Sequence, residues 1–197
     1  MDLSNLLASR RMSRSFDGTS VDPEWLAGLC ADALWAPTAG NAAGVRFHVV
    51  DALHVREFLD VATDSAWRES SRRYEGLARA GAAVLVTSRP EDYLARYAEA
   101  DKSSSGLSER DAWPLPYWHT DAAMATMALL LLLEESAWQA TIWGNFRHDA
   151  AVREWSGLGD EELFASVLIG HADASDVRSA SLEREVPSRR ERVRRVF

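Results

Sequence analysis

RRMSRSF, residues 10–16, places three arginines within five positions near the start of a chain of 197 residues. The chain as a whole is acidic, with a formal net charge of −8. Guanidinium and serine hydroxyl groups are natural phosphate ligands, so the stretch indicates a clamp for a single anion. A solvated turn after a helix is the alternative that composition leaves open.

A second stretch, WAPTAGNAAG at residues 35–44, joins an apolar helix to a strand. Small residues let a backbone approach a planar ligand closely, and Asn41 adds one amide to the connection. The alternative is that this stretch is only an irregular connection and binds no ligand. The two stretches are therefore the candidates for a binding site.

The flanking sequence predicts alternating helices and strands, of class α/β or α+β. Asp22-Pro23-Glu24 is a helix start, and apolar residues continue from it at helical spacing. We expect helices at 2–10, 24–34, 52–62, 67–79, 90–97, 119–138 and 148–155, and strands at 45–50, 82–87, 141–143 and 163–169. The whole chain, 1–197, is expected to form one domain.

Two segments fall outside this pattern. Residues 100–117 are polar and then rich in proline and aromatics, which predicts a loop over a site. Residues 172–197 have few core residues and predict an extended C-terminal arm that lies on another surface.

Composition argues against several classes of function. A sequence pI of about 5.1 disfavours a general nucleic-acid or membrane surface. The longest apolar run, residues 122–133, is shorter than the roughly 20 residues of a membrane span, and we see no signal peptide, so we expect a cytoplasmic protein. Cys30 is the only cysteine, and the five histidines are scattered, so we expect no metal site.

Taken together, RRMSRSF, helix 24–34 and WAPTAGNAAGVRFHVV resemble the nitroreductase family of FMN-dependent oxidoreductases in order, spacing and flanks. TIWGNF at 141–146 is similar to the strand and glycine-rich turn that the family places beside the flavin ring. FASVLIGHA at 164–172 is similar to the strand that follows, and PSRRERV at 187–193 to the closing arginine motif.

The resemblance implies an α+β fold with a central, mainly antiparallel sheet flanked by helices. It also implies a domain-crossed homodimer with FMN bound at the interface by residues of both chains. The apolar helix 119–138 would pack across the two-fold axis, and the arm 172–197 would wrap the partner.

The resemblance further implies roles for particular residues. Arg10 and Arg11 would hold the FMN phosphate, Arg14 would approach the N1/O2 side of the ring, and Asn41 would bond its pyrimidine edge. A backbone N–H of the 144–145 turn would face flavin N5. The implied cofactor-binding residues are Arg10, Arg11, Met12, Arg14, Pro37, Thr38, Asn41, Gly144, Asn145, Arg189 and Arg190, the last two as alternatives for a tail arginine at the phosphate. The implied substrate-pocket aromatics are Trp113, Tyr117, Trp118 and Trp143.

The function implied is hydride transfer from NADH or NADPH through flavin N5 to an electron-poor small molecule, such as a nitroaromatic or a quinone. The mechanism would be ping-pong at one site, with no catalytic side chain, because the cofactor carries the chemistry. Met12 stands where the family has serine, and Ala43 where it has glutamine. Each missing hydrogen bond would cost on the order of 1 kcal/mol. A non-catalytic FMN-binding or storage protein, or a fold that has lost its cofactor, are the alternatives.

Overall fold

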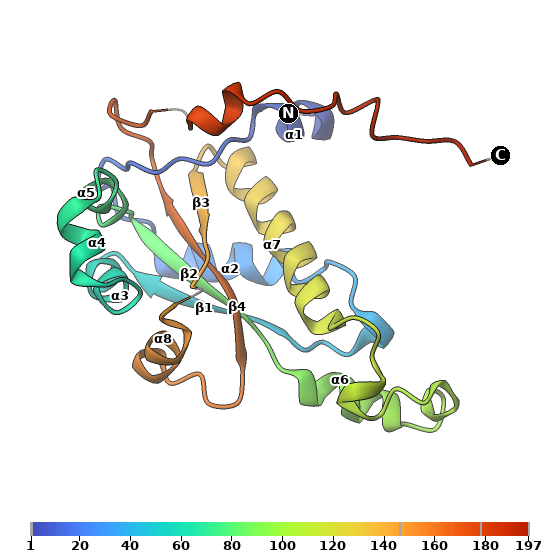
Figure 1. Ribbon diagram of the computed structural model, residues 1–197. Coiled ribbons are helices and arrows are strands. Elements are labelled where there is room, and N and C mark those ends of the chain that lie inside the picture. The colour runs from blue at the N-terminus through green and yellow to red at the C-terminus, as the bar shows by residue number, and fades with distance from the viewer. Residues whose placement is uncertain (1, 146, 178, 197) are drawn as a thin grey trace.

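The structure is a computed structural model, and it describes residues 2–145, 147–177 and 179–196. Its centre is an antiparallel sheet with the strand order β1-β2-β4-β3 (Figure 1). The strands are β1 (Val45–Asp51), β2 (Ala82–Ser88), β3 (Gln139–Trp143) and β4 (Glu162–Gly170). The α+β class, the antiparallel sheet and all four predicted strands are therefore confirmed.

Helices surround this sheet, and local signals in the sequence explain where two of them begin. The Asp2 carboxylate accepts the Ser4 N–H at 2.8 Å at the start of the first helix, and Asp22 caps the second through the Glu24 N–H. The helices are α1 (Leu3–Ser9), α2 (Pro23–Ala33), α3 (Val55–Val61), α4 (Ser65–Ser70), α5 (Tyr74–Leu77), α6 (Pro90–Ala98), α7 (Tyr117–Glu135) and α8 (Asp149–Ser156).

The prediction of one continuous helix at 67–79 is wrong, because the chain breaks into α4 and α5. Ser71 takes an extended conformation, and its hydroxyl accepts the Arg73 N–H at 3.2 Å, which competes with helical hydrogen bonding. The carbonyl of Gly76, in α5, accepts the Phe16 N–H at 3.1 Å. A tertiary contact with the N-terminal stretch therefore fixes the second piece.

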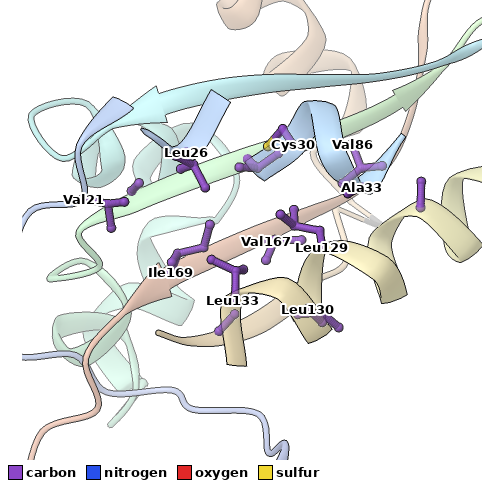
Figure 2. Packing of buried hydrophobic residues seen from close by; sticks show 14 of the residues in the cluster. Val21, Leu26, Cys30, Ala33, Val86, Leu129, Leu130, Leu133, Val167 and Ile169 are labelled. Carbon is purple, nitrogen blue, oxygen red and sulfur yellow. The ribbon is translucent and has the colours of Figure 1, made fainter. Parts of the chain in front are cut away.

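The core lies on both faces of the sheet, because β2 is buried along its whole length. Ala82, Val84 and Val86 face one cluster, and the intervening Ala83 and Leu85 face the other. Helices α2 and α7 cover the first face, where Leu26 and Cys30 meet Leu129 and Leu133 (Figure 2). Helices α3, α5 and α8 supply the second cluster.

The two ends of the chain lie on the same side of the molecule. Figure 1 shows the C-terminal segment running beside α1 and away from the sheet. Residues 184–196 are all exposed, and the only helical piece among the described residues of the tail is a short turn at Ala180–Glu183. That residues 172–197 form an arm lying on another surface stays a prediction.

Candidate functional site

The stretch RRMSRSF is an extended segment that lies between β3, α5 and the end of β4. The Ser13 N–H donates to the Ala140 carbonyl on β3 at 3.1 Å, and the Asp17 N–H donates to the His171 carbonyl at 3.0 Å. Backbone bonds to both sides hold the segment extended, so its arginine side chains project from a fixed backbone. Met12 packs against the core cluster beneath α7 instead of offering a hydroxyl.

A cavity of about 390 Å³ opens over these arginines. Its walls include Arg10, Arg11 and Arg14 from the N-terminal stretch, together with Arg189 from the tail. The Nε and Nη1 atoms of Arg10 are buried, and no hydrogen-bond partner lies among the described residues. Buried guanidinium donors without an acceptor are costly, so the site fits an anion such as the phosphate of FMN.

A second cavity, of about 400 Å³, shares Arg14 with the first. It is walled by Trp67, Arg72 and Arg73 on one side and by Trp143 at the end of β3 on the other. The rings of Trp67 and Trp143 meet edge to face, with centroids 5.3 Å apart. Arg14 therefore joins an arginine-lined cavity to one with aromatic walls, as a ligand with an anionic end and a planar end requires.

The predicted turn after β3 borders a third, smaller cavity. Gly144 lines this space of about 280 Å³ with Trp67 and Trp143. Asn145 is buried, and its amide donates to the Ser166 hydroxyl at 2.8 Å. Neither the Asn145 Oδ1 atom nor the Trp143 indole nitrogen finds a partner within the described part of the chain. Two polar atoms beside the turn are therefore buried without a hydrogen-bond partner among the described residues.

The turn with Pro37, Thr38 and Asn41 lies elsewhere. The Ala39 N–H donates to the Asp121 carboxylate at 2.7 Å, which ties the turn to α7. Asn41 has a φ of 58°, in the left-handed region, and is exposed. None of the described residues of this turn lines the cavities that Arg14 borders. Within one chain the turn and the arginines are therefore not brought together.

Three of the four predicted substrate aromatics also sit apart from Trp143. Trp113 and Trp118 are buried with Tyr93 in a small cluster at the junction of α6 and α7. The Trp113 indole donates to the Leu107 carbonyl at 2.8 Å, which fixes the 100–117 loop from inside. Tyr117 is 40% exposed. The loop is thus packed on its own aromatic core.

Glu162, at the start of β4, fastens this loop to the sheet. Its carboxylate accepts from the Trp118 indole at 3.1 Å, contacts the His119 Nε2 atom at 2.8 Å and pairs with Arg110. Burial raises the pKa of the Glu162 carboxyl, but Arg110 and His119 beside it outweigh this, and the net pKa is lowered. This carboxylate is a structural anchor at a distance from the arginine cavities.

Sequence reasoning missed three residues near the arginines. Arg72 and Arg73 line the aromatic cavity, and their signal was hidden because 67–79 reads as an exposed helical face. Asp176 lies in the tail, with its side chain 3% exposed and its Oδ2 atom 3.1 Å from Arg11. No local pattern predicts a pairing across so much of the chain. Arg190 borders a separate hollow within the tail, so of the two tail arginines Arg189 reaches the cavity of Arg10.

No group of three or more His, Cys, Asp or Glu side chains suited to a metal ion occurs among residues 2–145, 147–177 and 179–196. In the same residues, no helix has the length and apolar character needed to span a bilayer.

A family model described as Nitroreductase family matches residues 7–171, from α1 to the end of β4. The chain belongs to the nitroreductase family. This membership confirms the resemblance that RRMSRSF and WAPTAGNAAG indicated. Members of the family use FMN with NAD(P)H, so the protein is an FMN-dependent oxidoreductase of the nitroreductase type.

Solved structures show how widely this fold is shared. Nitroreductase CinD from Lactococcus lactis, in complex with nicotinic acid, superposes with a TM-score of 0.71 at 14% identity, covering 95% of this chain and 100% of that one. A nitroreductase family protein from Streptococcus pneumoniae TIGR4 gives 0.70 at 19% identity, with coverages of 98% and 100%. A candidate NAD(P)H:FMN oxidoreductase from Staphylococcus epidermidis gives 0.69 at 18%, with 100% and 96%. A search of curated proteins gave no match.

Proposed function

We propose that this nitroreductase passes reducing equivalents from NADH or NADPH to an electron-poor small molecule, of the nitroaromatic or quinone type, by a ping-pong mechanism. FMN, when bound, supplies hydride acceptance and donation at its N5 atom. The observation that carries the proposal is the pair of buried, unsatisfied Arg10 donors in a cavity that Arg14 connects to the aromatic cavity.

The residues of this chain bind and orient the FMN, and none of them performs an acid–base step. Arg10 and Arg189 bind the phosphate end through charge-assisted hydrogen bonds. Arg14, between the two cavities, places a fixed positive charge where the reduced ring accumulates negative charge, and such a charge favours reduction. The backbone at Gly144 and Asn145 offers N–H donors to the ring edge.

A homodimer is part of the same proposal, because one chain separates the two stretches that the family brings to one flavin. Apolar side chains are exposed on neighbouring α1 and α7, namely Leu3 at 60%, Leu7 at 49% and Met124 at 40%. Covering such side chains stabilises a dimer by about 25 cal/mol per Å². We propose that this face meets a second copy, so that Pro37, Thr38 and Asn41 reach the partner's flavin. Light scattering at micromolar concentration should give the mass of two chains; a single-chain mass would contradict the proposal.

The experiment that tests the function starts with the absorbance spectrum of the purified protein, with and without added FMN. Flavin bands should be present, and NADH or NADPH should be oxidised in steady state when menadione is supplied. Arg10→Ala should weaken FMN binding by about 2 kcal/mol in a fluorescence titration, because it removes a buried charge-assisted bond.

Arg56→Ala is the matched control for this titration. Arg56 pairs with Glu75, at 2.9 Å between Nη2 and Oε2, and lines none of the cavities bordered by Arg14. Its loss should leave FMN affinity unchanged. Equal affinities for wild type and Arg10→Ala would show that the phosphate binds elsewhere.

A second function, storage or sequestration of FMN without turnover, is favoured by one observation. Met12 packs on the core at a position where the family has a serine, so one phosphate donor is absent. Bound flavin with no oxidation of NADH or NADPH in the presence of menadione would support storage and exclude the enzyme.

A further inference from the structure

Asp176 lies among the arginines of the cofactor site although it belongs to the tail. Its Oδ1 atom accepts the backbone N–H of Arg14 at 2.8 Å, and its Oδ2 atom is 3.1 Å from Nη1 of Arg11. The side chain is 3% exposed, whereas that of Arg11 is 43% exposed. The carboxylate is therefore the buried member of the pair, and Arg11 is the exposed one.

The surroundings of this carboxylate are otherwise cationic. A cavity of about 440 Å³ borders Asp176 together with Arg14, Arg72 and Arg73. Among the described residues that line this cavity and the neighbouring cavity over Arg10, Asp176 is the only acidic one. A negative charge here acts directly against the binding of an anion.

The tail is anchored at this point by a different carboxylate. Asp173 accepts from the Ser15 hydroxyl at 3.0 Å and pairs with Arg79, and its backbone N–H donates to the Ser15 carbonyl at 3.1 Å. Asp173 lines none of the three cavities that Arg14 borders. Asp173 thus holds the first turn of the tail in place. The negative charge of Asp176 is not needed for that anchoring, which indicates another role for it.

We infer that Asp176 is an internal counter-ion of the arginine clamp: it offsets Arg11, so that FMN binds less tightly than the arginines alone would allow and exchanges more readily. This inference rests on the proposed FMN site. Because Asp176 neutralises Arg11, the phosphate is held chiefly by Arg10 and Arg189.

The test is Asp176→Asn, which keeps an oxygen for the Arg14 N–H and replaces the charged oxygen facing Arg11 by an uncharged NH2 group. FMN should bind roughly five- to tenfold more tightly in a fluorescence titration at low salt, as expected for loss of one partly screened charge near an anion. The gain should be smaller at about 1 M salt, where the Debye length is about 3 Å, but should persist in part, because salt screens a buried charge less than an exposed one.

Asp173→Asn is the control, since it makes the same change in net charge three residues away and outside the cavities. It should leave FMN affinity unchanged. Thermal melting without ligand should show both variants folded. Unchanged or weaker FMN binding by Asp176→Asn, or equal tightening by Asp173→Asn, would overturn the inference.

A second arm uses inorganic phosphate, so that the inference and the proposed function can fail separately. Phosphate should raise the melting temperature of Asp176→Asn more than that of wild type or Asp173→Asn, because tighter binding to the folded state gives a larger shift. If wild type and all variants bind no FMN, the proposed function fails. The phosphate shifts then decide the inference alone, and equal shifts in the three proteins would refute it.

Discussion

Replacing Asp121 by alanine should destabilise the protein by about 3 kcal/mol. Asp121 lies on α7 and is 1% exposed; its carboxylate accepts the Ala39 N–H at 2.7 Å and the Tyr93 hydroxyl at 3.0 Å. Alanine leaves both donors buried without this acceptor. A hydrogen bond to a charged group contributes about 1.5–3 kcal/mol, so the two together contribute about 3–6 kcal/mol. The desolvation cost of the carboxylate, which alanine removes, offsets part of this.

Two conservative variants separate the contributions. Tyr93→Phe removes one hydroxyl and should cost about 1.5 kcal/mol. Asp121→Asn keeps a carbonyl oxygen for the Ala39 N–H and should cost about 1–2 kcal/mol. The expected order of stability is wild type, then the two conservative variants, then Asp121→Ala.

Urea unfolding followed by circular dichroism, at one fixed protein concentration, gives these free energies. A fixed concentration is needed because an associating protein is stabilised by mass action. Asp121→Ala within 1 kcal/mol of wild type, or equal to Tyr93→Phe, would refute the claim that one carboxylate holds both the turn before β1 and helix α6.

Three further predictions concern backbone packing, pH and thiol reactivity. Gly81→Ala should cost about 2–4 kcal/mol in the same assay, because a Cβ there would lie 2.0 Å from the Thr19 carbonyl oxygen, a backbone atom that cannot rotate away. Glu162→Gln should lower the free energy of unfolding by about 1 kcal/mol at neutral pH. Because the folded-state pKa of Glu162 is lowered, this contribution is present above the ordinary pKa of 4.5 and is lost as the pH falls through the folded-state value. Unfolding free energies measured against pH would show this loss. Burial raises the pKa of the Cys30 thiol to about 12, so iodoacetamide at mildly alkaline pH should label it only after unfolding, as mass spectrometry would report.

The parts of the fold that sequence predicts are those with local causes. Asp22 and Pro23 mark the start of α2 because capping needs only neighbouring residues. The strand at 82–88 follows from a run of small, β-branched and other aliphatic residues that no charged residue interrupts. The arginine stretch at 10–14 can be predicted as an anion site from sequence, because closely spaced guanidinium groups bind anions wherever the chain places them.

The remaining features depend on contacts between distant parts of the chain. The break at Ser71 follows in part from the packing of α5 against Phe16, which no window of sequence contains. The sequence predicts that Trp113 and Trp118 face a ligand, whereas in the structure both are buried against Tyr93 in a local cluster. Asp176 contacts Arg11 only because the chain after β4 lies beside the N-terminal stretch. Tertiary contact overrides local preference at each of these positions.

The strand order has a consequence for how the protein is made. β4 follows the other three described strands in the sequence, yet it lies between β2 and β3. Until a ribosome has released residues 162–170, β2 has an open hydrogen-bonding edge and β3 has no neighbour in the sheet. Residues 10–14 leave the ribosome before Ala140, His171 and the tail, and their positions are fixed only when these later partners are in place. We therefore expect the sheet to be completed only after β4 has emerged, with chaperone dependence concentrated in the interval before that.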